Sequence, residues 1–573
     1  MKLKKKLYIL CTLAIIIPLM MACQSQTSST LTIKDDNTTV GETTTETPTS
    51  GEGTTETPTT NLQNREEYII SDQRLEADMM DDNYREYYEI LVGTFSDSDQ
   101  DGMGDFQGLI NRLDYLNDGL PNSGKSLGIT GIWLMPIMPS PSYHKYDTTD
   151  YKAIDPAYGS MEDFQAFMDQ SNQRGIDVMI DLVINHTSSQ HPWFLNALQA
   201  ARSGDTDNKY LDYYTLVRQE EQVDGRRYYH FHGDLYYEGN FWSEMPELNL
   251  DSPYVRQEIK EIIAFWFEKG VHGFRLDAVK YPYYEEHERN IAFWNWFMEE
   301  VTKLKADAYV VGEMWDSNAN IYPYYEPFNN FDFAMSQLNG YVAMTVRGLE
   351  TVNDYVAYLK SYKDNVKAVN ANAILQPFIS NHDMNRAAGY LFVDEYSMHI
   401  AANLYVLTYG SPFIYYGEEI GMMGSRSTEN TDANRRLAMF WGDGDRVTNP
   451  VGSTWTIDRQ INGSVMEQIP LENSLYNHYK KLIMLRHANP EIARGTYTPL
   501  DFDGYTAFGG FLSTYNGSTV GVFHNTSFVE ITIDLSQYTD QAFTIIRGYA
   551  GKDQAQLDGQ TLTIGPLTSV ILK

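Results

Sequence analysis

An arginine and a carboxylate stand two residues apart in the segment GFRLDAVKY, residues 273–281. The flanking residues are mostly apolar and favour a buried β-strand, in which side chains two positions apart point to the same face. Arg275 and Asp277 therefore share a face. Burial of a guanidinium and a carboxylate costs free energy unless the two groups pair or serve a function. This face is therefore a candidate site for chemistry.

Three other apolar segments end in groups of the same kind. They are DLVINH, VVGEMWD and FISNHD, which carry Asp181, Asn185, His186, Glu313, His382 and Asp383. A single aspartate at a strand end is more often a helix cap or an ion-pair partner than a catalytic group. The whole set suits glycosyl transfer, in which one carboxyl group is the nucleophile and a second is the acid/base. A nearby arginine favours an ionised nucleophile, whereas a crowded, partly desolvated glutamate keeps its proton near neutral pH.

Strand-like and helical patterns alternate along the chain from about residue 86. Helical patterns include residues 252–270, which begin with the start signal Ser252-Pro253, and residues 290–306 and 471–488. Strands that alternate with helices predict a parallel sheet, and eight such units predict an α/β fold with a closed (β/α)8 TIM barrel. The active site of such a barrel lies at the carboxyl ends of its strands. The eight candidate strands cover residues 87–95, 128–137, 177–185, 273–279, 308–315, 331–335, 373–381 and 412–419.

Two regions depart from this alternation. A Tyr- and charge-rich stretch separates the third candidate strand from the helix at 252, and we interpret it as an inserted domain at about residues 187–250. Near the C-terminus the pattern changes to short β-like runs, which predict an antiparallel β-sandwich over residues 491–573. The barrel domain is accordingly expected to span residues 84–490.

The N-terminal residues have the features of a targeting segment. MKLKKK is a basic region and is followed by a short apolar stretch that ends in LMMAC. This pattern resembles a bacterial lipoprotein signal over residues 1–22, with Cys23 as the lipidated residue. The alternative is ordinary secretion, with no role for Cys23. Residues 23–83 are rich in Thr, Pro and Glu, repeat the motif TTETPT and are expected to form a disordered tether.

The charge of the chain excludes one class of partner. With 77 acidic and 43 Lys or Arg residues, the formal net charge is −34. Such a balance argues against binding to nucleic acid or to an anionic membrane surface. We therefore expect contact with a membrane only through the lipid anchor. We also expect a monomer, although the charge of the chain does not bear on this.

The segments DLVINH, GFRLDAVKY, GEMWD and FISNHD resemble the four conserved regions of glycoside hydrolase family 13, the α-amylase family. The resemblance covers about residues 84–573 and includes the strand order, the insertion and the C-terminal β-domain. It implies a retaining mechanism on α-glucosidic bonds, with Asp277 as the nucleophile, Glu313 as the acid/base and Asp383 as a stabiliser of the transition state. It also implies a set of substrate-binding residues, namely Tyr146, His144, His186, Arg275, His382 and, on the leaving-group side, Lys280.

An acidic loop, DSDQDGMGDF at residues 97–106, follows the first candidate strand. Carboxylates that alternate in a tight, glycine-containing loop suit Ca²⁺, which prefers hard oxygen ligands. The loop resembles the calcium site of the oligo-1,6-glucosidase branch of the family. The alternative is a solvated acidic turn. The resemblance implies a structural calcium ion with the ligands Asp97, Asp99, Asp101, Asp105 and the backbone carbonyl of Met103.

The segments HKYDTTDY (144–151) and MPELN (245–249) resemble the neopullulanase and cyclomaltodextrinase branch. Residues 24–83 are too polar and too short for the extra N-terminal β-domain that is usual there. The mixture resembles lipid-anchored bacterial α-amylases between the two branches. We therefore expect an α-amylase that acts on starch or maltodextrins at the outer face of the cell membrane. The alternatives are a neopullulanase-like or 4-α-glucanotransferase activity and, in another class, a non-catalytic glucan-binding lipoprotein.

Overall fold

The computed structural model describes residues 82–120, 123–391, 396–424 and 432–573. The predicted signal segment, the lipidation site Cys23 and all but the last two residues of the predicted tether lie outside these ranges. Among the described residues, no helix is both long enough and apolar enough to cross a membrane.

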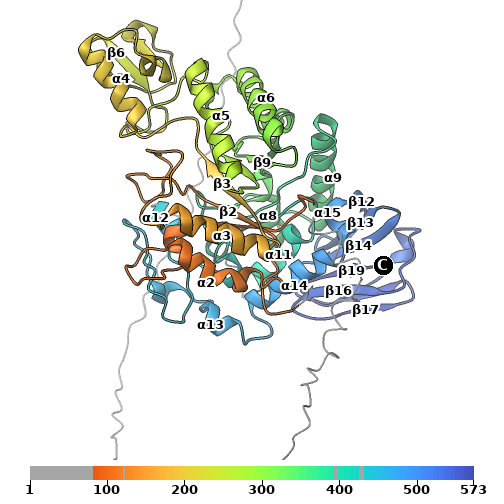
Figure 1. Cartoon of the computed structure of the whole chain (residues 1–573). Helices are drawn as coiled ribbons and strands as arrows, with labels where there is room; N and C mark the ends of the chain where they lie inside the picture. Colours follow the sequence, from red (N-terminus) through yellow and green to blue (C-terminus); the bar gives the residue numbers. More distant parts are fainter. Residues whose placement is uncertain (1–81, 121–122, 392–395, 425–431) are drawn as a thin grey trace, which may run out of the picture. The chain divides into compact units, whose positions relative to one another are not determined.

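The central element is a sheet of seven parallel strands in the order β10-β9-β7-β3-β2-β1-β11. Figure 1 labels β2, β3 and β9 of this sheet. From β1 to β10, the strands that lie side by side in the sheet also follow one another along the chain as barrel strands, as a (β/α)8 barrel requires. The strands are β1 (Tyr87–Ile90), β2 (Gly131–Leu134), β3 (Asp177–Leu182), β7 (Gly273–Leu276), β9 (Tyr309–Gly312), β10 (Asn329–Asn330) and β11 (Phe413–Tyr415).

The segment 375–377 joins the two edges of this sheet. On one side, Gln376 forms a parallel bridge with Phe331, directly after β10. On the other side, the Phe413 N–H of β11 donates to the Pro377 carbonyl at 3.0 Å. The segment therefore occupies the place of the remaining barrel strand and closes the barrel.

Two predicted strands differ from the structure. The strand predicted over 373–381 is reduced to the bridge at Gln376, and Pro377 lacks the N–H that a regular ladder needs. The strand predicted over 331–335 is displaced, because β10 ends at Asn330 and a 3-10 helix covers Phe333–Met335. The remaining six strands lie within their predicted ranges but are shorter.

The predicted helices are present with small shifts at their ends. The helix α5 (Pro253–Glu268) has Ser252 as its N-cap and proline in its first turn, and α6 (His287–Leu304) buries Phe293, Trp294, Phe297 and Val301. The predicted helix at 471–488 is α14 (Leu475–His487). Other helices between the barrel strands are α2 (Phe106–Leu116), α3 (Met161–Gln173), α9 (Val352–Val369) and α11 (Ser397–Val406).

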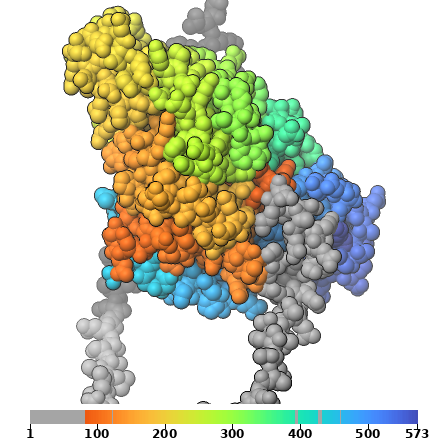
Figure 2. Space-filling model, viewed as in Figure 1, coloured from red at the N-terminus to blue at the C-terminus, as the bar shows by residue number. Residues whose placement is uncertain are grey.

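The region between β3 and α5 packs its aromatic side chains together as an extension of the main hydrophobic core. It contains α4 (Pro192–Ser203) and an antiparallel sheet of β4 (Leu216–Arg218), β6 (Leu235–Glu238) and β5 (Tyr228–His232). The ring of Phe194 packs edge-on against Tyr214, Phe231 and Tyr237. Arg226 ties this region to the segment before α6 through a 2.8 Å ion pair with Glu286. In Figure 2 the yellow inserted region and the green residues of α5 and α6 lie side by side.

The C-terminal region consists of two antiparallel sheets, in the orders β12-β13-β14-β19-β16 and β15-β18-β17. Its core contains Phe502, Phe508, Phe523, Leu562 and Val570. The sheets are formed by β12 (Thr496–Leu500), β13 (Phe508–Tyr515), β14 (Ser518–Asn525), β15 (Ile531–Asp534), β16 (Ile546–Gly551), β17 (Ala555–Asp558), β18 (Thr561–Ile564) and β19 (Thr568–Leu572).

Candidate active site

Arg275 is the centre of the charged groups inside the barrel. Its side chain is fully buried and lies on β7. Its Nη1 is 2.9 Å from Asp181 Oδ2 on β3 and 2.7 Å from Asp277 Oδ1, and its Nη2 is 2.8 Å from Glu313 Oε2. The three carboxyl groups therefore meet at one guanidinium, as the shared face of Arg275 and Asp277 predicted.

Glu313 is poised to keep its proton near neutral pH. It follows β9, and its Oε2 accepts the backbone N–H of Ala278 at 3.1 Å. Burial raises its pKa, Arg275 opposes this effect, and the neighbouring Asp277 and Asp383 add to it, so that the pKa is raised to about 8. A carboxyl group of this kind is a general acid at neutral pH.

The backbone after Asp277 has an unusual conformation. Ala278 adopts φ +50°, in the left-handed region that residues with a Cβ rarely occupy. The N–H of this residue is the one that donates to Glu313 Oε2. The chain therefore uses a strained residue to link the ends of β7 and β9.

Asp383 stands between two cationic groups. Its Oδ1 is 2.7 Å from Arg436 Nη2, and its Oδ2 is 3.1 Å from His382 Nε2. Burial alone would raise the pKa of Asp383, but His382 and Arg436 hold it well below its usual range. Burial likewise opposes protonation of His382, yet the carboxylates of Asp383 and Glu89 raise its pKa to about 9. The two groups therefore favour each other's charged form, an ionised Asp383 and a protonated His382.

Tyr146 lies on the same side of the pocket. Its hydroxyl donates to Asp181 Oδ2 at 2.9 Å and is 2.6 Å from His382 Nε2, and its ring stacks on that imidazole. His186 Nε2 is 3.2 Å from the Tyr146 carbonyl, and the Tyr146 N–H is 3.2 Å from His144 Nδ1. Burial lowers the pKa of both histidines, to about 4 for His144. Two neutral imidazoles and a phenol ring thus face the pocket.

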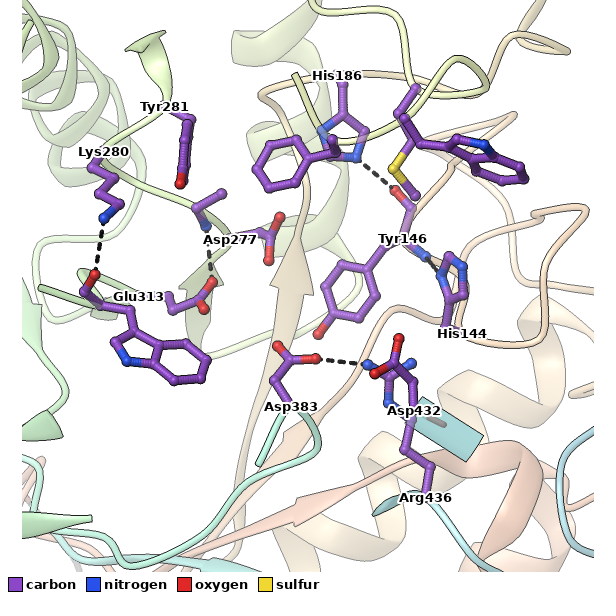
Figure 3. Close-up of a pocket in the computed structure, with 15 residues that line it drawn as sticks. His144, Tyr146, His186, Asp277, Lys280, Tyr281, Glu313, Asp383, Asp432 and Arg436 are labelled. Carbon is purple, nitrogen blue, oxygen red and sulfur yellow. Dashed lines mark hydrogen bonds and ion pairs between the residues drawn. The ribbon is translucent and has the colours of Figure 1, made fainter. Parts of the chain in front are cut away.

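These groups line one cavity of about 610 Å³ (Figure 3). Lys280 also lines it, and its Nζ binds the Trp315 carbonyl at 3.0 Å and Asp316 at 3.1 Å. Arg275, Asp181 and His382 are completely or almost completely buried behind the lining residues. The cavity is lined by His144, Tyr146, His186, Phe241, Trp242, Met245, Asp277, Ala278, Lys280, Tyr281, Glu313, Trp315, Asp383, Asp432 and Arg436.

Sequence reasoning did not identify several of these residues. Arg436 follows the short helix α12 (Asp432–Arg435) and lies in no predicted strand, so that no spacing indicates it. Phe241 and Trp242 come from the loop after β6, and their position depends on the fold of the inserted region. Glu89 did carry a signal, because it is a lone carboxylate in the apolar run of β1, but it was assigned no role.

The acidic loop after β1 lies outside this cavity. One carboxylate oxygen each of Asp97, Asp99 and Asp105 lies within 4.8 Å of the others. Asp101 is not part of this group, and its Oδ1 accepts the Met103 N–H at 2.7 Å. Asp105 also caps α2 by accepting the Gly108 N–H at 2.7 Å. Three hard oxygens at this spacing fit a divalent cation such as Ca²⁺.

The fold and the carboxylate set define a glycosidase barrel, and comparison with known proteins agrees. Residues 89–495 match the family model of the alpha-amylase catalytic domain, so the chain belongs to the α-amylase family, glycoside hydrolase family 13. Alpha-amylase 3 of Dictyoglomus thermophilum is 34% identical over 495 residues, which cover 85% of this chain and 92% of that protein. A 4-alpha-glucanotransferase of Thermotoga maritima is 32% identical over 355 residues, which cover 60% of this chain and 74% of that protein.

A solved structure extends this similarity to the fold. Amy13B of Eubacterium rectale superposes with a TM-score of 0.79 and 35% sequence identity. The match covers 88% of this chain and 96% of that chain. The similarity therefore includes the parts of the chain that carry the site.

Proposed function

We propose that this protein is a retaining α-amylase, which hydrolyses α-1,4-glucosidic bonds in starch and maltodextrins. The observation that carries the proposal is the bridge from Arg275 to both Asp277 and Glu313, at a place where burial raises the pKa of Glu313 to about 8. The two carboxyl groups bind adjacent nitrogens of one guanidinium. This arrangement favours the carboxyl separation of roughly 5 Å found in retaining enzymes over the wider separation of inverting ones.

The reaction has two steps. In the first, Asp277 attacks the anomeric carbon while Glu313 donates its proton to the leaving glycosidic oxygen, which gives a covalent glycosyl-enzyme and a free acceptor end. In the second, the Glu313 carboxylate removes a proton from water, and the water oxygen displaces Asp277 from the anomeric carbon. The enzyme returns with Glu313 protonated and Asp277 ionised.

The other groups of the cavity bind the sugar at the cleavage point. Asp383, held as an anion by His382 and Arg436, accepts hydrogen bonds from sugar hydroxyls and strengthens them as positive charge develops on the ring. Tyr146 offers a ring on which the sugar stacks. In the family resemblance, His144 and His186 bind the same sugar and Lys280 binds on the leaving-group side.

A calcium ion would be held by the loop after β1. Asp97, Asp99 and Asp105 supply the clustered carboxylates, and the resemblance adds Asp101 and the Met103 carbonyl. The role of the ion is structural, because the loop lies outside the catalytic cavity. We further propose that lipidation of Cys23 anchors the monomeric enzyme at the outer face of the cell membrane, where it meets glucan.

The products formed early in the reaction test this function. The full-length protein, purified in detergent, is incubated with soluble starch, pullulan, β-cyclodextrin or maltotriose, and the products are resolved by size. A spread of maltodextrins from starch, with little product from pullulan or cyclodextrin, is the expected result. Panose from pullulan with fast opening of cyclodextrin would instead indicate a neopullulanase.

A second candidate function is transfer of the glycosyl group to another sugar. The similarity to a 4-alpha-glucanotransferase favours it. Products longer than the maltotriose supplied would establish that transfer exceeds hydrolysis. No product from any substrate, with starch still bound, would identify a glucan-binding protein and contradict the enzymatic proposal.

A further inference from the structure

Glu89 is a buried carboxylate that the proposed reaction does not use. It lies on β1, paired with Trp133 of β2 and Tyr415 of β11, and is only 1% exposed. An ionisable group is expensive to bury without a partner. The partner here is a residue of the active site, since Glu89 Oε1 is 2.5 Å from His382 Nδ1.

The contacts of His382 form a chain across the barrel. On one side, Glu89 accepts from Nδ1–H and, at 3.4 Å, from the backbone N–H of His382. On the other side, Nε2 is 3.1 Å from Asp383 Oδ2 and 2.6 Å from the Tyr146 hydroxyl. A carboxylate at Nδ1 fixes the proton on that nitrogen and the orientation of the ring.

The remaining neighbours of His382 do not replace Glu89. Trp133 of β2 faces the ring edge-on and carries no charge. Arg436 binds the His382 carbonyl at 3.1 Å rather than the ring, and its positive charge opposes protonation of the imidazole. Asp383 is an anion but contacts Nε2 of His382 rather than Nδ1, and the Tyr146 hydroxyl, which also contacts Nε2, carries no charge. Glu89 is therefore the anion that faces Nδ1.

We propose that Glu89 is a positioning residue of the catalytic centre, which acts through His382. From β1 it binds the Nδ1–H, and it thereby presents a charged ring with its Nε2–H directed at Asp383 and the sugar position. This proposal rests on the proposed function, in which Asp383 and His382 bind the sugar at the cleavage point. It predicts that a neutral group at position 89 weakens catalysis without any change at a residue that touches substrate.

The variant Glu89→Gln tests the role by kinetics. Its amide oxygen still accepts from Nδ1–H, but the negative charge is lost. We expect kcat to fall roughly ten-fold with a smaller change in KM, by analogy with the loss seen when the carboxylate behind a metal-binding histidine is removed. Because the pKa of His382 falls by roughly 1–3 units without the contacting anion, the alkaline limb of kcat/KM moves to lower pH.

A matched control separates this effect from general loss of stability. Glu86 is equally buried and binds another histidine, His487, with Oε2 2.5 Å from Nε2. Glu86→Gln is expected to lower the melting temperature while the pH profile of kcat/KM stays as in the unaltered protein. Glu89→Gln with unchanged kcat and an unchanged pH profile would overturn the proposal and leave the proposed α-amylase activity intact.

A second measurement reads the protonation of His382 directly, in the protein with Glu89 unchanged and without an assay of activity. The ring nitrogens of His382 are followed by NMR in the ¹⁵N-histidine-labelled protein, with His382→Gln for assignment. We expect both ring nitrogens to remain protonated from pH 6 to above pH 7, as a carboxylate on each side of the ring requires. A neutral ring at pH 7 would overturn the role of Glu89, whether or not the protein degrades starch.

Discussion

At the scale of single residues, Asp277 performs the covalent step of the proposed reaction. Replacement Asp277→Asn removes the nucleophile but preserves the size of the side chain. We expect hydrolysis of starch to fall to background, while binding of starch, measured by co-sedimentation or affinity electrophoresis, stays close to that of the unaltered protein. Hydrolysis at the original rate would show that another group is the nucleophile.

The pKa of Glu313 predicts how activity depends on pH. The group must be protonated to donate to the leaving oxygen, and burial raises its pKa to about 8. The value of kcat/KM is therefore expected to be maintained below this pH and to fall as the pH rises through about 8. Initial rates on a soluble maltooligosaccharide across pH 5–10 measure this limb. If kcat/KM already fell as the pH rose from 5 to 6, Glu313 would not be the general acid with a raised pKa.

The sequence indicates the catalytic residues because each lies on or directly after an apolar strand. A charged residue in such a run must be paired or functional, and this argument holds for Arg275 and Asp277. It applies equally to Glu89 in the apolar run of β1, although the sequence alone does not indicate which residue Glu89 contacts. Arg436 lies outside the strands, so that only the folded chain reveals its contact with Asp383.

At the scale of elements, the loop after β1 is expected to bind Ca²⁺. A cation that binds the folded state alone raises stability, so that excess chelator is expected to lower the melting temperature. Scanning calorimetry with and without Ca²⁺ measures this shift. The variant Asp99→Asn should reduce the response to Ca²⁺, whereas Asp503→Asn, an exposed aspartate of the C-terminal region, should retain it. An equal melting temperature in chelator and in Ca²⁺ would rule out a stabilising ion.

The alternation of strands and helices was sufficient to predict the barrel but not the bounds of all its strands. Periodicity identifies buried runs, yet the extent of a strand depends on the hydrogen bonds that its neighbours offer. Pro377 interrupts the predicted strand at 373–381 and leaves one bridge, although the segment still closes the barrel. The helices were predicted more closely, because start signals such as Ser252-Pro253, with proline in the first turn, mark where they begin.

At the scale of the whole molecule, buried polar contacts join the barrel to the C-terminal sheets. Asn403 of α11 donates to the Ala550 carbonyl at 2.8 Å and to Ser569 Oγ at 2.9 Å, and its Oδ1 is 2.7 Å from His478 Nε2. The sequence gives no sign of this network, because its members are far apart along the chain. We infer that the two regions unfold together.

Removal of the Asn403 side chain tests this coupling. Asn403→Ala removes the hydrogen bonds to the Ala550 carbonyl, Ser569 Oγ and His478 Nε2. Ser569 keeps its bond to His524 and His478 its bond to the His399 carbonyl, so that the loss amounts to roughly 1–3 kcal/mol in total. We expect the free energy of unfolding, measured in urea, to fall by about this amount, while kcat is retained because Asn403 lies outside the catalytic cavity. The exposed Asn365→Ala serves as the control. A loss no larger than in this control would contradict a role for Asn403 in stability.

Covalent trapping identifies the nucleophile of a retaining glycosidase and therefore tests the role of Asp277. A 5-fluoro-α-glycosyl fluoride forms a slowly hydrolysed glycosyl-enzyme, and mass spectrometry of the digested protein identifies the modified residue. We expect a single adduct, on the peptide that contains Asp277. An adduct on another carboxylate, such as Asp383 or Asp181, with Asp277 unmodified would contradict this role.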